Sequence, residues 1–307
     1  MKAKYINPYT DFGFKKLFGE EGSKELLKDF LNELLPPVHK IQSLTLKPTE
    51  RLPNLSTERK AIFDIHCVSE SGSRFIVEMQ KAKHNFFKDR AVFYSTFPMQ
   101  EQAEKGEWDF QLSPVYCVAL LDFTFNKEKK EDEYLSNIQL KNQYCEVFYD
   151  KLTFLFIEMP RFTKTEKELK THFDKWLYFL KHLEDFTEIP EILNEQIFIE
   201  GFHKAELASY NESERYLYEE SLKVYRDMFS IMKTAAHDSY VEGTLKGIIE
   251  GKREGKREGK KEGKMEAKLE VVKNGIEQGL SSEIISQLTG ISIEEIDKMK
   301  SLSKGVD

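Results

Sequence analysis

The sequence predicts an α/β domain followed by a mostly helical region. Up to about residue 160, short runs that alternate apolar and polar residues, as strands do, are interleaved with runs of helical spacing. After Pro160 the helical spacing continues with few breaks to about residue 300. The chain of 307 residues, 40% of them hydrophobic, is long enough for one large core or two smaller ones. We expect an α/β domain at 1–160, a helical region at 161–242, a Gly-rich charged helical repeat or linker at 243–280 and a terminal helix pair at 281–307.

The N-terminal segment is expected to form two short helices. Residues 11–35 place apolar side chains at helical spacing, and Gly19 and Gly22 interrupt the pattern. Pro36 ends it, because proline cannot continue a helix. A possible strand follows at 41–48.

The next element is a predicted β-hairpin with strands near 61–68 and 74–80. Val, Ile and Phe alternate here with polar residues about a Ser/Gly-rich centre. If the hairpin is symmetric about Ser71, Asp64 faces Glu78 and Ile62 faces Gln80. One face is then wholly apolar and suits a core: Phe63, Ile65, Cys67, Phe75, Val77 and Met79. The other face carries Asp64, His66, Glu78 and Gln80.

After the hairpin the pattern predicts one helix and further strands. Residues 85–105 read as a helix that is interrupted around Pro98. Strands are expected at 114–125, 144–149 and 153–158. The three cysteines, Cys67, Cys117 and Cys145, all lie in predicted strands at spacings that match no zinc motif, so we expect buried thiols.

The C-terminal half holds three distinct helical patterns. Thr165 and Glu168 form a capping box before an amphipathic run. Glycine recurs every fourth residue from Gly243 to Gly263, which predicts either a flexible charged linker or a helix whose small-residue stripe allows a close neighbour. Residues 281–300 read as two short helices joined at Gly290, with Ser292 and Glu295 capping the second.

Charge and hydropathy narrow the classes of function. A net charge of −7 argues against a protein coated with phosphate-binding surface, although residues 81–90 hold four basic residues against one acidic. The chain has no apolar run of membrane-spanning length, and its first residues lack the features of a signal peptide. We therefore expect a cytoplasmic protein without a membrane partner.

The acid pair in the hairpin is the candidate site. Side chains that face each other across antiparallel strands have Cβ atoms about 4.5–5.5 Å apart, so the carboxylates of Asp64 and Glu78 would repel each other. A divalent cation would compensate, since Mg²⁺ favours one or two carboxylates with water and phosphate oxygens. A solvated polar face with an accidental acid pair is the alternative. His66 is a less favoured ligand, because a hydrogen-bonded core histidine is commoner.

The wider pattern resembles the PD-(D/E)XK nucleases, and more specifically the Rpn family of recombination-promoting nucleases and putative transposases. The resemblance is carried by NPYTDFGFKKLFG (7–19), FDIHC (63–67), FIVEMQ (75–80), the helix with Arg90 and Tyr94, and PVYCVALLDF (114–123). It implies a restriction-endonuclease-like core with the order α-β-β-β-α-β and a metal-dependent DNA endonuclease that uses Mg²⁺ or Mn²⁺.

The same resemblance assigns roles to individual residues. Asp64 and Glu78 match the acids that bind metal, and Asp11 in the first helix matches an acid brought to the same site. Gln80 stands where the superfamily usually has lysine, which stabilises developing negative charge and positions water, whereas glutamine only donates and accepts hydrogen bonds. Lys81 and Lys83 follow, but strand alternation would direct them to the opposite face.

Three readings of the function remain open. In the first, the protein is a nuclease in which metal at Asp64 and Glu78 activates water and phosphate, while Lys83, Lys88 and Arg90 contact the DNA backbone. In the second, Gln80 marks a weakened or inactive enzyme that binds DNA or regulates. In the third, the chain is an interaction module without a nucleic-acid role. The C-terminal helices are candidates for homo-oligomer formation.

Overall fold

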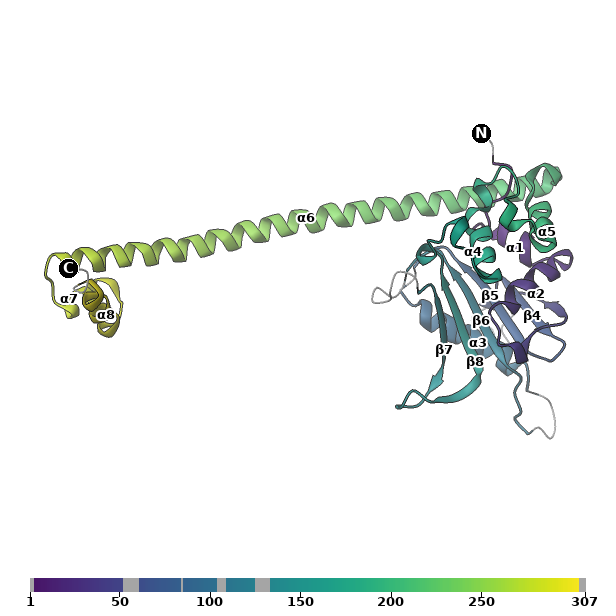
Figure 1. Ribbon diagram of the computed structural model, residues 1–307, viewed down its shortest axis with the longest axis horizontal. Helices are drawn as coiled ribbons and strands as arrows, with labels where there is room; N and C mark the ends of the chain where they lie inside the picture. The colour runs from purple at the N-terminus through teal and green to yellow at the C-terminus, as the bar shows by residue number, and fades with distance from the viewer. Residues whose placement is uncertain (1–2, 52–60, 84, 104–108, 125–132, 304–307) are drawn as a thin grey trace. The chain divides into compact units, whose positions relative to one another are not determined.

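The computed structural model describes residues 3–51, 61–83, 85–103, 109–124 and 133–303 (Figure 1). The chain divides into two compact units, Met1–Met228 and Phe229–Asp307. The boundary expected near residue 160 lies inside the first unit. This is because Trp176, Phe198 and other apolar residues after that boundary are buried in the same core as the strands.

A mixed six-stranded sheet forms the centre of the first unit, in the order β1-β4-β5-β6-β8-β7. Its strands are β1 (Leu44–Lys47), β4 (Ile65–Ser69), β5 (Arg74–Gln80), β6 (Val115–Leu121), β7 (Leu135–Lys141) and β8 (Val147–Glu158). β5, β6 and β8 are parallel to one another, and β1, β4 and β7 run antiparallel to their neighbours. A separate antiparallel pair joins β2 (Glu50–Arg51) to β3 (Ala61–Ile62).

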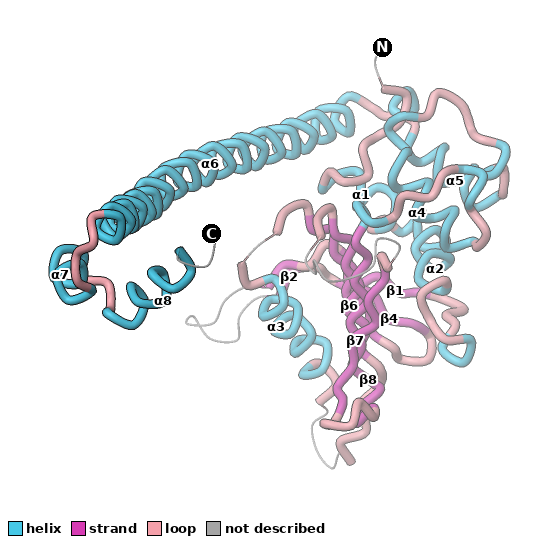
Figure 2. Tube along the Cα trace, turned by 60° about the vertical axis from the view of Figure 1, so that its left-hand side comes forward, coloured by secondary structure: helices cyan, strands magenta, loops and turns pink. Residues whose placement is uncertain are grey.

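Helices cover both faces of the sheet (Figures 1 and 2). One face packs against α1 (Asp11–Phe18), α2 (Lys24–Asn32), α4 (His172–His182) and α5 (Gln196–Ala205), and the other against α3 (Phe87–Gln100). The period-2 alternation of β5 supplies both cores, since Phe75 and Val77 join the first cluster and Ile76 joins the α3 cluster. Elements α1, β1, β4, β5, α3 and β6 follow the expected α-β-β-β-α-β order.

The hairpin has the predicted register along most of its length. Ile65 pairs with Val77 and His66 with Ile76. Ile62, however, pairs with Glu50 in the small sheet and does not face Gln80. The chain breaks its strand at Phe63 and Asp64, so the alternation restarts, and Phe63 is buried in the α3 cluster rather than with Ile65.

The two short N-terminal helices are confirmed. Thr10 caps α1 by accepting the Gly13 N–H at 2.9 Å, and Gly19 follows its last residue. The Thr165–Glu168 capping box opens a short 3-10 helix, whereas α4 has a box of its own from Thr171 and Asp174. The short 3-10 helices span Glu21–Ser23, Pro37–His39, Met159–Arg161, Glu166–Glu168, Leu183–Asp185, Glu191–Leu193 and Leu207–Ser209.

Four expectations, on two strands, a cysteine and a helix, need correction. β7 was not expected. The segments 144–149 and 153–158 are largely one strand, β8, because β7 pairs with it on both sides of Asp150, with an irregular register there. Cys145 is exposed and has a φ of 63° in the turn before β8, unlike the buried Cys67 and Cys117. Helix α3 runs through Pro98 and ends two residues later.

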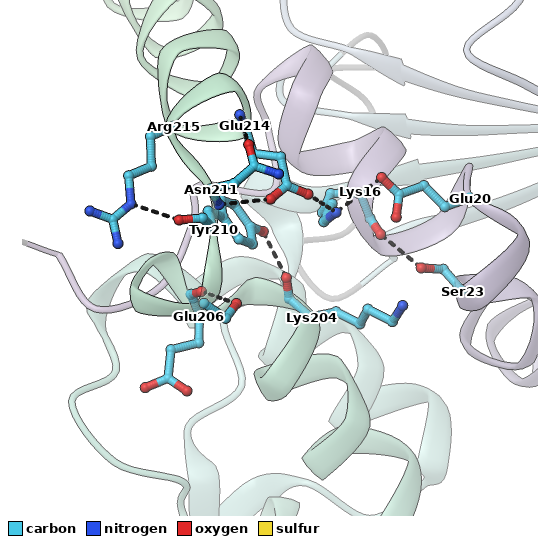
Figure 3. A network of polar contacts seen from close by, with 10 residues as sticks. Lys16, Glu20, Ser23, Lys204, Glu206, Tyr210, Asn211, Glu214 and Arg215 are labelled. Atoms are coloured by element: carbon cyan, nitrogen blue, oxygen red, sulfur yellow. Dashed lines mark hydrogen bonds and ion pairs between the residues drawn. The ribbon is translucent and has the colours of Figure 1, made fainter.

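The longest helix, α6 (Glu212–Glu277), is anchored to α1 by a polar network at its first turn (Figure 3). The Glu214 N–H donates to Asn211 Oδ1 at 2.9 Å, and the Asn211 N–H donates back to Glu214 Oε2 at 3.0 Å. Lys16 of α1 pairs with Glu214 at 2.6 Å. Tyr218 and Leu222 are buried in the first unit's core just beyond this network.

The second unit contains the rest of α6 and a small helical cluster. The glycine repeat lies within the helix, and nothing lies within 4 Å of a Cβ built on any glycine from Gly243 to Gly263. The predicted helix pair is confirmed as α7 (Ser282–Thr289) and α8 (Ile293–Ser303), with Gly290 at a φ of 69° between them. The core of this helical cluster consists of Val272 from α6 together with Ile285, Ile291 and Ile296.

Among the described residues, no helix is both long enough and apolar enough to cross a membrane.

Candidate functional site

Asp64 and Glu78 meet where β4 begins and β5 approaches its end. Asp64 directly precedes β4, so its backbone N–H lies outside the backbone hydrogen bonds of that strand and is free to donate to a side chain. The Asp64 N–H donates to Glu78 Oε1 at 3.2 Å. In return, the Met79 N–H donates to Asp64 Oδ2 at 2.7 Å. The break in the strand therefore locks the two carboxyl groups beside each other.

The second oxygen of Glu78 is held by two side chains. Gln80 Nε2 donates to Glu78 Oε2 at 2.9 Å from two positions along the same strand. Arg90 Nη2 donates to the same oxygen at 3.2 Å from the facing helix α3, and its guanidinium lies 5.1 Å from the centre of the Tyr94 ring. Glu78, Gln80, Arg90 and Tyr94 line one cavity together with apolar side chains of β6 and α3.

Burial and neighbouring negative charge raise the pKa of both acids. Burial, and then the neighbouring charge of Asp64, raise the pKa of Glu78 to about 8, although Arg90 opposes this shift. Burial also raises the pKa of Asp64, against the hydrogen bond from the Met79 N–H, and the charge of Asp11 adds to the increase. At neutral pH Glu78 therefore tends to hold a proton unless a positive charge compensates.

Asp11 is the first residue of α1, and its charge acts on Asp64. Its side chain is more than half exposed and forms an ion pair with Lys15 at 3.1 Å. Its negative charge raises the pKa of Asp64 and of Lys81, which places it on the Asp64 side of the pair. Within the described ranges no three His, Cys, Asp or Glu side chains are grouped closely enough to hold a metal ion.

The donor set nevertheless suits a hard divalent cation. Asp64 and Glu78 lie beside each other, and burial raises the pKa of both carboxyl groups, so a bound cation would favour their charged forms. Mg²⁺ is commonly held by only one or two carboxylates, with the remaining positions taken by water and substrate phosphate. The pair fits that description without a third protein ligand.

Lys81 is the residue that strand alternation alone misses. It is half-buried, and burial lowers its pKa, while the charges of Asp11 and Asp64 counteract that effect. β5 ends at Gln80, and Lys81, the next residue, lies close enough to Asp11 and Asp64 for their charges to raise its pKa. The sequence held one indication of its place: Asp11 and Asp64 were expected at the same site, and two acids there favour a lysine close by.

The three basic residues expected to contact DNA are not equivalent. Lys83 and Lys88 are exposed near the beginning of α3. Arg90 is partly buried, and its side chain is already engaged with Glu78 and Tyr94. His66 is buried with its Nε2 3.9 Å from Glu101 Oε2, on the α3 side of the sheet with Ile76.

Comparison with known proteins gives one match. A family model described as PD-(D/E)XK nuclease family transposase matches residues 8–235, a range that begins before α1 and ends within α6. No curated protein and no solved structure gives a significant match.

Proposed function

Because the chain belongs to the PD-(D/E)XK nuclease family transposases, we propose that it hydrolyses DNA phosphodiester bonds with the help of Mg²⁺ or Mn²⁺, in recombination or a transposase-like process. The observation that carries this proposal is the buried pair of Asp64 and Glu78. Two adjoining carboxyl groups, one with its pKa raised to about 8, are costly to keep charged unless a cation joins them.

Each residue of the site has a proposed role. Asp64 and Glu78 hold the cation, which when bound polarises the scissile phosphate as a Lewis acid. Gln80, whose amide lies 2.9 Å from Glu78, orients the attacking water by a hydrogen bond. Asp11 adds negative charge beside Asp64 and so strengthens the attraction for the cation.

The basic side chains near α3 are proposed to bind the DNA backbone. Lys83 and Lys88 are exposed and offer charge that attracts phosphate irrespective of base sequence. Arg90 has a second task, because its bond to Glu78 at 3.2 Å fixes the position of that carboxyl group before the cation and the DNA arrive.

Incubation with supercoiled plasmid tests the proposal. Wild-type protein should nick the plasmid with Mg²⁺ or Mn²⁺ and not with EDTA, and Asp64→Asn or Glu78→Gln should abolish nicking. Glu25→Gln is the matched control, because Glu25 is an exposed acid on α2 and its removal should leave nicking unchanged. Full nicking by a folded Asp64→Asn/Glu78→Gln double variant would end the proposal.

A second candidate is a DNA-binding or regulatory protein that has lost cleavage. It is favoured by Gln80 at the usual lysine position and by the occupation of Glu78 Oε2 by Gln80 and Arg90. Absence of nicking under all metal conditions, together with DNA binding in Ca²⁺, would select this alternative.

We also propose that the C-terminal helices mediate self-association. Val241, Leu245 and Ile248 are exposed on α6 at spacings of four and three residues, so they share one side of the helix. A second copy would bury these side chains as a helical pair does.

The cytoplasm is the proposed location, because a DNA substrate lies inside the cell.

A further inference from the structure

Helix α3 presents two exposed aromatic rings on either side of Arg90. Phe86 caps the helix and is 73% exposed, and Phe93 lies in the second turn and is 48% exposed. The Arg90 N–H bonds to the Phe86 carbonyl at 3.0 Å, so Phe86 stands one turn before Arg90. Phe93 stands three residues after it, which is about 4.5 Å along the axis. The α3 ring pair, Phe86 and Phe93, therefore flanks the arginine that contacts Glu78.

The α3 ring pair takes no part in the buried packing of α3. That packing uses Phe87, whose ring lies 5.1 Å from Phe156, and the partly buried Ala91 and Tyr94. Phe93 contacts two rings of its own helix, with its ring centre 5.1 Å from that of Phe97 in an edge contact and 6.3 Å from that of Tyr94 in a tilted one. An apolar ring that stays in water forgoes the favourable free energy of burial. We therefore expect two such rings beside a candidate active site to have a binding partner.

The charge around the rings indicates the chemistry of that partner. Lys83, Lys88 and Arg90 lie in or next to the first turn of α3, and Asp89 is the single acid among residues 83–93. Positive charge interleaved with exposed aromatic rings is the usual composition of a surface for single-stranded nucleic acid, since phosphates meet the cations and bases stack on the rings. A second copy of the chain fits less well, because a symmetric contact would oppose the same lysines.

Resting on the proposed nuclease function, we propose that the α3 ring pair stacks against unpaired bases of the DNA, so that the preferred substrate contains a single-stranded stretch. In duplex DNA the bases are already stacked on one another and offer no free face to Phe86 or Phe93. An unpaired strand that crosses α3 puts its bases on the rings and its backbone beside Arg90 and the Asp64–Glu78 pair.

Binding measurements test this assignment directly. Fluorescence anisotropy in EDTA at one fixed salt concentration gives the Kd for a labelled 20-nucleotide single strand and for the matching duplex. Stacking on one aromatic ring is worth a factor of about 5 to 150 in affinity, so Phe86→Ala/Phe93→Ala should weaken single-strand binding at least about tenfold and change duplex binding less than about twofold. Phe93→Tyr keeps a ring and should bind like the wild type.

The control is Phe148→Ala, which removes a ring that is 81% exposed on β8, in another part of the same unit. It should alter neither Kd. The proposal is overturned if the wild type does not bind the single strand, if the double variant binds it normally, or if both DNA forms lose affinity equally. Circular dichroism establishes that the variants are folded.

Plasmid cleavage separates this proposal from the proposed function. One outcome is that the wild type nicks plasmid in Mg²⁺ while the double variant keeps an unchanged preference for single-stranded over duplex DNA. In that case the nuclease assignment survives and the stacking surface does not. If single-strand binding depends on the ring pair but no cleavage occurs, the surface is supported and the nuclease assignment fails.

Discussion

At the scale of single residues, the site depends on how many positive charges reach the Asp64–Glu78 pair. Arg90 Nη2 lies 3.2 Å from Glu78 Oε2, and the charges of Lys15 and Lys81 act on Asp64. Gln80 brings only a neutral amide to Glu78. The balance of charge therefore tends towards a protonated acid when no cation is bound.

Substitution of Gln80 should change the rate of cleavage in both directions. Gln80→Lys adds a positive charge within reach of the developing negative charge on phosphate, and should raise single-turnover cleavage. Gln80→Ala removes the amide that donates to Glu78 and should lower it. A single stabilising donor is worth about 10²–10³ in rate, so effects approaching that size are expected. Unchanged rates for both variants on a short DNA at saturating Mg²⁺ would mean that Gln80 only satisfies a hydrogen bond.

Metal binding should release a proton from Glu78. Its pKa is raised to about 8, first by burial and then by Asp64, so below pH 8 the carboxyl group must lose a proton before it can hold a cation. Calorimetric titration with Mg²⁺ at pH 7, in two buffers of different ionisation enthalpy, should give close to one proton released per ion. The release should fall towards zero above pH 9, and Glu25→Gln should behave like the wild type. Zero release at pH 7 would contradict the raised pKa.

The acid pair itself was predictable from the sequence, but its surroundings were not. Symmetry of the hairpin brings position 64 to position 78, and the register from Ile65 to Val68 agrees with it. The bond from Arg90 joins residues 12 positions apart through packing of α3 on the sheet, which no periodicity encodes. Phe63 was expected on the wrong face, because alternation is reliable only within an unbroken strand.

At the scale of elements, the cap of α4 combines several polar contacts in one buried carboxyl group. Asp174 is almost fully buried, and accepts hydrogen bonds from Lys164 at 2.6 Å, Tyr134 at 3.0 Å and the Lys170 N–H at 3.0 Å. Burial alone would raise its pKa, but these bonds overcome it and lower the pKa to about 2. The charged form of Asp174 therefore stabilises the fold.

Asp174→Asn should destabilise the first unit in a pH-dependent way. A folded-state pKa of about 2, below the ordinary value of 3.8, gives stability that is present above pH 4 and is lost as the pH falls towards 2. The loss at pH 7 should be about 2 kcal/mol, and the difference between variant and wild type should shrink below pH 4. Urea unfolding followed by tryptophan fluorescence measures it. An equal difference at pH 7 and pH 2.5 would contradict the argument.

The glycine repeat offers a test of helix stability. A Cβ added at Gly247, Gly251, Gly255 or Gly259 meets nothing within 4 Å, and each Gly→Ala change removes about 0.8–1 kcal/mol of unfavourable helix propensity. The fourfold Ala variant should therefore melt at higher temperature by circular dichroism at 222 nm. Light scattering supplies the second readout, since a loss of self-association would mean that another helix packs closely against the glycines.

The order of elements up to β6 follows from the sequence, because turns and alternation there are locally marked. β7 lacks that signal, since LSNIQLK alternates weakly and is stabilised by pairing with β8 at the edge of the sheet. The continuity of β8 likewise comes from its two neighbours rather than from its own pattern. The glycine repeat left a linker and a helix equally plausible, because each glycine costs about 1 kcal/mol while each charge pair returns only about 0.2–0.5 kcal/mol, so an isolated helix is marginal.

At the scale of the whole molecule, the candidate site and the C-terminal helices belong to different units of the chain. The acid pair, the α3 ring pair and the network that fixes the start of α6 all lie within Met1–Met228. The unit Phe229–Asp307 holds its own small core of Val272, Ile285, Ile291 and Ile296. The family match ends at residue 235, close to the division between the two units.

A chain that ends at Thr234 should therefore keep its cleavage chemistry and lose self-association. It retains every residue of the proposed site and the buried contacts of Tyr218 and Leu222, and it lacks the exposed apolar positions Val241, Leu245 and Ile248. Light scattering should give a smaller assembly than for the full-length protein, while single-turnover cleavage of a short DNA by saturating enzyme stays within about twofold. A double change, Leu245→Lys with Ile248→Lys, in the full-length chain should reproduce the smaller assembly if these side chains form the contact. The same number of subunits in all three proteins would mean that this part of the chain does not mediate assembly. A loss of single-turnover rate in the shortened chain would mean that the second unit contributes to the reaction itself.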